Sequence, residues 1–129
     1  MLLAFLISFW MTATDPSVLT VPVVHAEEID YSTTTLRIYA KKMAIEHNLN
    51  VTHFIKTIQC ESNFKYDALG DMGTSIGIAQ FRYPERWGLS TTTAYDPYIS
   101  IDKMAQAWDD GLEWHWSCYN KLYGSKGLE

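Results

Sequence analysis

The sequence is short of basic residues, of cysteines and of long apolar runs. Its 10 Lys and Arg are outnumbered by 15 Asp and Glu, which gives a formal charge of −5 and offers no basic surface to nucleic acid. Hydrophobic residues make up 47% of the chain and charged residues 19%, a balance that excludes an intrinsically disordered protein. We therefore expect a folded protein without a nucleic-acid partner, and 129 residues leave room for one domain.

The first 26 residues differ in character from the rest. The apolar run over residues 2–11 is too short to span a bilayer comfortably, and Val24-His25-Ala26 supplies the small residues of a signal-peptidase site. We interpret residues 1–26 as a signal peptide and residues 27–129 as the domain, which predicts a secreted or cell-envelope protein. The alternative is an uncleaved N-terminal anchor, the chain's one expected membrane attachment, because no Lys or Arg precedes the apolar run.

The two cysteines, Cys60 and Cys118, agree with export, because an oxidising compartment allows such a pair to form a disulfide. We expect that bridge, which would close a long loop and stabilise a small core. The alternative is a pair of buried free thiols. Metal binding is disfavoured because no Cys or His lies at ligand spacing from either cysteine, so we expect no metal and no cofactor.

Apolar residues at helical spacing predict two helices in the first half of the domain. The first runs from residue 36 to about residue 47, and residues 33–35 offer hydroxyl groups for its N-cap. The second carries an apolar stripe over residues 51–58, with Asn50 or Thr52 as its cap.

The second half combines an irregular segment with two more helices. Three glycines punctuate residues 70–81, which predicts a loop or short hairpin. Asp96-Pro97 is a strong helix start that leads to an end at Gly111, and a short helix should follow over residues 116–123. The expected fold is mainly α, with one Gly-rich loop in the middle.

Glu61 is the most informative residue of the chain. Counting three residues on from Ile58 in the stripe of Phe54 and Ile58 puts its carboxyl group on the buried face at the end of the second helix. An apolar environment raises the pKa of a carboxyl group and keeps a proton available near neutral pH, as a glycosidic general acid requires. The alternative from helical phase alone is a glutamate turned to solvent or capping a neighbouring loop.

The Gly-rich loop has a spacing that argues for close contact with a ligand. It matches neither a dinucleotide fingerprint nor a phosphate-binding loop, which would need a Gly-Lys-Ser/Thr ending. Glycines at these positions let the main chain approach a substrate, while Ser75 and Gln80 can form hydrogen bonds to its amide or hydroxyl groups. The alternative is a plain connecting turn.

These residues together resemble a known family. Residues 60–64 (Cys-Glu-Ser-Asn-Phe) followed by residues 73–80 (Gly-Thr-Ser-Ile-Gly-Ile-Ala-Gln) resemble the Glu-Ser and Gly-Leu-Met-Gln pattern of the soluble lytic transglycosylases. Asp96-Pro97 and residues 116–119 resemble later landmarks of small exported members. The similarity covers about residues 34–123, and the C-terminal match is the loosest part of it.

The resemblance implies a lysozyme-like single domain that cleaves the β-1,4 bond between N-acetylmuramic acid and N-acetylglucosamine in peptidoglycan. It implies that Glu61 first donates a proton and then acts as base, that Ser75 and Gln80 contact the sugar, and that Tyr119 helps to position the acid. In this family the 6-hydroxyl of N-acetylmuramic acid attacks and a 1,6-anhydro end forms. The expected partner is a peptidoglycan glycan strand, bound by a monomer.

Two other functions stay open. A peptidoglycan hydrolase of the same fold would need a second carboxylate, for which Asp67 and Asp71 are the nearest downstream candidates. A non-catalytic wall-binding module is the third possibility, and the presence of Glu61 together with Ser75 and Gln80 disfavours it.

Overall fold

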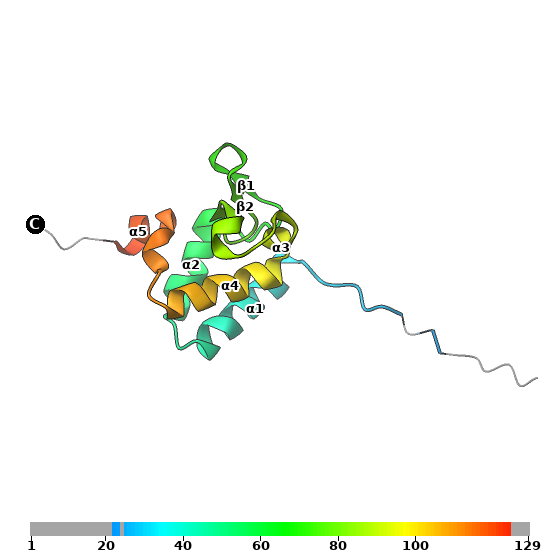
Figure 1. Ribbon diagram of the computed structural model, residues 1–129. Coiled ribbons are helices and arrows are strands. Elements are labelled where there is room, and N and C mark those ends of the chain that lie inside the picture. The colour runs from blue at the N-terminus through cyan, green and yellow to red at the C-terminus, as the bar shows by residue number, and fades with distance from the viewer. Residues whose placement is uncertain (1–21, 24, 125–129) are drawn as a thin grey trace, which may run out of the picture.

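The computed structural model describes residues 22–23 and 25–124, and over this part the protein is mainly helical, as predicted (Figure 1). Most of the predicted signal segment, residues 1–26, lies outside the described residues. Within the described part, no helix has the length and apolar character needed to cross a membrane.

Helices α1 (Thr33–Glu46) and α2 (Val51–Ser62) lie where the apolar spacing predicted them. The cap of α1 differs from the prediction: Ser32, rather than residues 33–35, has extended backbone and accepts a hydrogen bond from the Thr35 amide. Asn50 caps α2 as expected, by accepting a hydrogen bond from the amide of His53.

The Gly-rich segment forms a small antiparallel sheet rather than an unstructured loop. Its strands are β1 (Leu69–Gly70), β2 (Ser75–Ile76) and β3 (Phe81–Arg82), in the order β1-β2-β3. A 3₁₀ turn, η1 (Asp71–Gly73), connects the first two strands. The expectation of a loop or short hairpin in this segment is confirmed, with one strand more than a hairpin has.

The C-terminal half of the domain contains three helices and two 3₁₀ turns. They are η2 (Pro84–Trp87), α3 (Thr91–Tyr95), α4 (Pro97–Asp109), η3 (Glu113–His115) and α5 (Ser117–Tyr123). Asp96 caps α4 as predicted, and its carboxylate accepts hydrogen bonds from the amides of Tyr98 and Ile99. Helix α3 was not expected from the sequence.

The core lies between α1, α2 and α4, with the small sheet at one end of α2 (Figure 1). Its fully buried side chains include Leu36 from α1, Phe54 and Ile58 from α2, and Ile101 and Met104 from α4. Helix α5 packs on α2, so the C-terminal segment returns to the helix that carries Glu61. This return makes the site described below possible.

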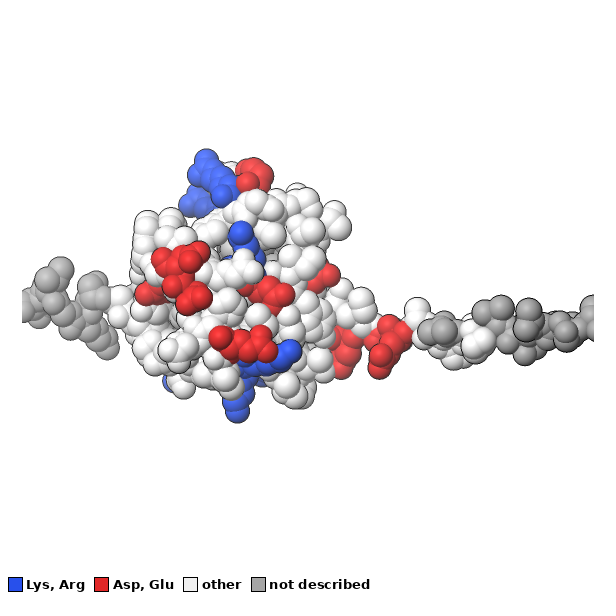
Figure 2. Space-filling view, turned by 60° about the horizontal axis from the view of Figure 1, so that its bottom comes forward, with Lys and Arg blue, Asp and Glu red and all other residues white. Residues whose placement is uncertain are grey.

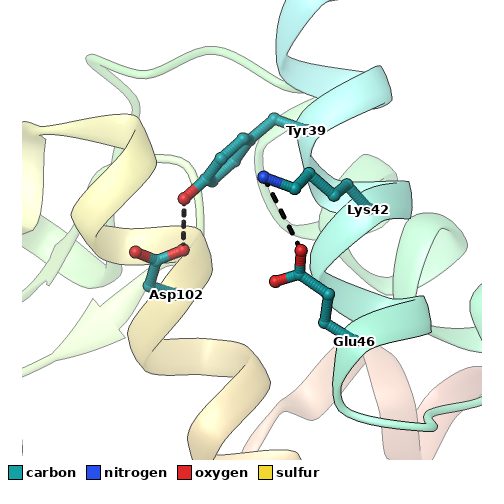
Figure 3. A network of polar contacts seen from close by, with 4 residues as sticks. All are labelled: Tyr39, Lys42, Glu46 and Asp102. Carbon is teal, nitrogen blue, oxygen red and sulfur yellow. Dashed lines mark hydrogen bonds and ion pairs between the residues drawn. The ribbon is translucent and has the colours of Figure 1, made fainter.

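A polar contact joins α1 to α4 at the side of the core (Figure 3). The Tyr39 hydroxyl donates a hydrogen bond of 2.6 Å to the Asp102 carboxylate. Burial, and then the adjacent carboxylate, raise the pKa of Tyr39, so its hydroxyl stays protonated as the donor. The neighbouring pair of Lys42 and Glu46, 3.6 Å apart, lies within α1 and is exposed, so it contributes at most about 0.5 kcal/mol.

Gly77 allows the sheet to pack against α3. Its φ of +79° favours glycine, and a Cβ at this position would overlap the carbonyl oxygen of Ala94. The same carbonyl accepts a hydrogen bond of 2.8 Å from the Ser100 hydroxyl. The glycine therefore has a packing role, in addition to any approach to a ligand.

The charged side chains are unevenly distributed over the surface. Figure 2 shows one face on which acidic side chains form several separate groups, some of them next to basic side chains, with uncharged residues over most of the surface. This agrees with the formal charge of −5.

Candidate active site

A cavity of about 880 Å³ lies between the end of α2, the sheet and the segment that leads into α5. Its size falls within the range of ligand-binding clefts. The cavity contains polar, charged and aromatic groups. Its lining residues are Glu61, Asp71, Ser75, Gln80, Phe81, Arg82, Tyr83, Arg86, Trp87, Leu112, His115, Trp116 and Ser117.

Glu61 lies in the last turn of α2 and is half-buried at this cavity. Its Oε1 accepts a hydrogen bond of 3.0 Å from the backbone amide of Cys118. Burial raises the pKa of Glu61, and the negative charge of Asp71 adds to the rise, while the Cys118 amide and the Ser117 hydroxyl oppose it. The net direction is upward, which favours the protonated form that a general acid needs.

The helical phase of Glu61 is slightly different from the prediction. The buried stripe of Phe54 and Ile58 continues at Ser62, four residues on, and Ser62 is 8% exposed. The Ser62 hydroxyl donates a hydrogen bond of 2.6 Å to the carbonyl of Ile78, which fixes the end of α2 to the sheet segment. Glu61 therefore lies at the edge of the stripe, where it is partly desolvated and still faces the cavity.

The predicted disulfide between Cys60 and Cys118 is present, with a Cα–Cα distance of 5.9 Å. It joins the residue before Glu61 to the residue whose amide donates to Glu61. The bridge therefore holds the Cys118 amide close to the end of α2, where Glu61 accepts its hydrogen bond.

Ser75 from β2 and Asp71 from η1 both line the cavity. Ser75 is only 2% exposed, and its hydroxyl donates a hydrogen bond to the Asp71 carboxylate. Asp71 is exposed in η1 and lines the same cavity as Glu61. The structure thus brings a second carboxylate to the site, whereas Asp67, the other candidate, is not among the lining residues.

Gln80 also lines the cavity, but its amide group contacts the protein's own main chain. Its Nε2 donates hydrogen bonds to the carbonyls of Gly77, at 2.9 Å, and Ala68, at 3.2 Å. The side-chain oxygen lies so close to Gly70 that a Cβ there would overlap it. Gln80 therefore holds the sheet segment in shape, and its φ of 51° is an uncommon backbone conformation for this residue type.

Tyr119 is not brought to the cavity that contains Glu61. Its ring packs against Trp108, with 5.0 Å between ring centroids, and it lines a smaller, separate pocket of about 220 Å³ together with His53. Tyr119 follows Cys118 directly, but it lies on the face of α5 that packs toward α2 and α4. The groups that contact the carboxyl group of Glu61 are instead the amide of Cys118 and the hydroxyl of Ser117.

The aromatic and basic residues in the cavity wall were not predicted from the sequence. Trp87 lies about 5.3 Å, centroid to centroid, from each of Phe81, Trp116 and His115. Trp116 is fixed by its indole N–H, which donates a hydrogen bond of 2.8 Å to the carbonyl of Ala79. A usable signal was present in the sequence, because residues 81–87 hold three aromatic and two basic residues.

The chemistry available in the cavity is that of a half-buried acid beside aromatic rings. Among residues 22–23 and 25–124, no group of three or more His, Cys, Asp or Glu side chains could hold a metal ion. Comparisons of the chain with family models, with curated proteins and with solved structures find no match.

Proposed function

We propose that this protein is a peptidoglycan lytic transglycosylase with a lysozyme-like fold, and that Glu61 is its catalytic acid and base. The observation that carries the proposal is the carboxyl group of Glu61, half-buried in an 880 Å³ cavity, with a pKa above its ordinary value. The motif resemblance over residues 60–64 and 73–80 supports the choice of substrate. The expected location is the cell envelope or the secreted fraction.

In the proposed reaction, protonated Glu61 donates its proton to the glycosidic oxygen as the bond from the anomeric carbon to that oxygen breaks. The leaving sugar departs with a free hydroxyl group. Ionised Glu61 then takes the proton of the 6-hydroxyl of N-acetylmuramic acid as that oxygen bonds to the anomeric carbon. The product is a 1,6-anhydro end, and Glu61 is protonated again.

The rest of the cavity has features suited to a sugar polymer. The partly exposed rings of Tyr83 and Trp87 line the cavity and offer apolar surface to sugar rings. Ser117 lines the same cavity as Glu61 and is exposed. Gln80 and Ser75 act mainly through the shape of the wall, because their polar groups contact Ala68, Gly77 and Asp71.

A hydrolase of the same fold is the second candidate, and Asp71 is the observation that favours it. Asp71 lines the cavity and is close enough to Glu61 to raise its pKa. A second carboxylate of this kind can activate water or stabilise positive charge at the anomeric carbon. The two candidates differ in their products and in how much they need Asp71.

Asp71→Asn separates the two candidates. For a transglycosylase we expect the variant to keep activity within several-fold of wild type, because the attacking group belongs to the substrate. Mass spectrometry of digested peptidoglycan should find 1,6-anhydro ends. Reducing ends, together with a loss of about a hundredfold or more in the variant, would instead identify a hydrolase. Asp67→Asn, two residues before β1 and outside the cavity, is the matched control.

The pH dependence follows from the raised pKa of Glu61. Activity should decline on the alkaline side as Glu61 loses its proton, and this limb should lie above the ordinary value of 4.5. Asp71→Asn should move the limb to lower pH, because it removes a negative charge that raises the pKa. Initial rates of wall clearing across pH test both shifts, and a limb at or below 4.5 would show that the carboxyl group is solvated.

The same pKa makes a statement about stability. Between the unfolded and the folded pKa of Glu61, the native state binds more protons than the unfolded state. The free energy of unfolding should therefore fall as pH rises through this window, and the loss remains at neutral pH. Melting temperatures of wild type and Glu61→Gln should converge at pH values below the window, with the variant modestly more stable at pH 7. A variant less stable than wild type at pH 7 would contradict the burial argument.

A further inference from the structure

Two arginines form part of the cavity wall beside the acid. Arg82 ends β3 and Arg86 lies in η2, and both line the same cavity as Glu61. Both side chains are exposed, so a ligand in the cavity can reach them. The function proposed above has no role for either residue.

The ring of Tyr83, which lies between the two arginines in the sequence, contacts both guanidinium groups. The Arg86 guanidinium carbon lies 4.5 Å from the centroid of the Tyr83 ring, and that of Arg82 lies 5.5 Å from the same centroid. The Tyr83 amide donates a hydrogen bond of 2.9 Å to Thr74, and its carbonyl accepts one of 2.9 Å from the Arg86 amide. Both positive charges thus lie within 5.5 Å of the centre of one aromatic ring.

In the part of the chain that the structure describes, neither arginine forms an ion pair of 4.0 Å or less with an acidic side chain. Within the described residues, the ion pairs closer than 4.0 Å are Lys42–Glu46 and His47–Asp109, both away from the cavity. The groups that shift the pKa of Glu61 are Asp71, the Cys118 amide and the Ser117 hydroxyl, and neither arginine is among them. The protein has a net charge of −5, so two arginines side by side in the lining of the candidate active site, neither in one of these ion pairs, are unexpected.

Guanidinium groups are well suited to bind carboxylates. Each presents a planar fork of N–H donors that matches the two oxygens of a carboxylate, and such charge-assisted hydrogen bonds are stronger than neutral ones. A glycan built only from N-acetylglucosamine carries no anionic group. A strand with N-acetylmuramic acid carries carboxylates, either on its stem peptide or on the lactyl group left when the peptide is removed.

We propose that Arg82 and Arg86 form an anion subsite that binds a carboxylate of the muramic acid unit and so fixes the position of the strand relative to Glu61. This inference rests on the proposed function, because it assumes a peptidoglycan strand in the cavity. The group that the cavity wall recognises on the substrate is then a carboxylate. The two arginines that bind it lie outside the motifs at residues 60–64 and 73–80.

The test measures binding without cleavage, in the Glu61→Gln background. Fluorescence anisotropy of labelled, soluble strands compares this parent with a variant that also carries Arg82→Gln and Arg86→Gln. Three strands are used: one with stem peptides, one stripped of peptides by an amidase, and one with its carboxylates converted to neutral amides. The control adds Lys41→Gln and Lys56→Gln to the parent, which removes the same positive charge from exposed positions outside the cavity.

We expect the arginine variant to bind carboxylate-bearing strands about tenfold more weakly than the parent, and the lysine control to bind them within about twofold. The amidated strand should bind the parent and the arginine variant equally. Weakening confined to the strand with stem peptides would identify a peptide carboxylate as the ligand. Weakening confined to the stripped strand would identify the lactyl carboxylate, and weakening on both charged strands would show that the subsite accepts either carboxylate.

Equal binding of charged strands by the parent and the arginine variant would overturn the subsite, and so would an equal loss in the lysine control. Failure of the proposed function looks different. In that case wild-type protein releases no anhydro or reducing ends from peptidoglycan, and the Glu61→Gln parent binds none of the three strands.

Discussion

Glu61→Gln is expected to lower wall-clearing activity by about a hundredfold to ten-thousandfold, the range typical for loss of general acid–base catalysis. Glutamine keeps the size of the side chain, and its oxygen can still accept the hydrogen bond from the Cys118 amide, at 3.0 Å in the wild type. It cannot donate an acidic proton to a glycosidic oxygen. The circular dichroism spectrum should therefore stay unchanged while turnover is lost.

Glu85→Gln is the matched control for this experiment. Glu85 lies in η2 close to the cavity, is exposed and is not one of its lining residues, so the variant loses the same charge without touching the acid. We expect it to clear walls at the wild-type rate. A correctly folded Glu61→Gln protein with activity within several-fold of wild type would exclude Glu61 as the catalyst.

The helices with a strong apolar stripe and a polar cap could be predicted from the sequence. Asn50 and Asp96 both cap the helix that they precede, because each combines a side-chain acceptor with an extended backbone. The disulfide could also be predicted, since two cysteines in a chain with a predicted signal peptide are expected to form a bridge. The two caps depend on local rules, which can be read from one sequence.

Helix α3 could not be predicted in the same way. It has only five residues, three of them threonines, which are poor helix formers, and its stripe is a single buried Ala94. Its stability comes from tertiary contacts. The Ala94 carbonyl accepts a hydrogen bond from Ser100, and α3 packs against β2 where Gly77 has no side chain.

The candidate site could be predicted only in part. Helical phase put Glu61 near the core, and the spacing of the loop brought Ser75 and Gln80 to the same cavity. Their polar groups contact the protein itself, which no spacing rule reveals. Arg82, Arg86 and Trp87 were missed because they lie on a short strand and a 3₁₀ turn, where there is no periodicity from which to infer a common face.

Replacing both Cys60 and Cys118 by Ala is expected to lower the free energy of unfolding by about 4 kcal/mol, from the loop-closure entropy of a bridge that spans 58 residues. The melting temperature should fall by well over ten degrees for a domain of this size. Reduction of the wild-type protein should give the same result. Denaturant unfolding of the oxidised, reduced and double-variant proteins measures the change.

The bridge should matter for activity as well, because it fixes the backbone that contacts Glu61. Helix α5 has seven residues, too few to be stable alone, and its other anchors are ring contacts such as His53 on Tyr123, at 3.6 Å, and Tyr119 on Trp108, at 5.0 Å. Without the bridge, the Cys118 amide is held near Glu61 only by those contacts and by its own hydrogen bond. We expect the double variant to lose activity at temperatures well below its melting point, where the helices of the core are still folded.

Adding reductant to the double variant should change nothing further, which separates the effect of this bridge from a general effect of the reagent. Two thiols that titrate in unreduced, unfolded wild-type protein from an oxidising compartment would show that no bridge forms. A double variant within about 1 kcal/mol of wild type would show that the bridge adds little to the fold, and full activity up to its melting point would show that α5 keeps its position through side-chain packing alone.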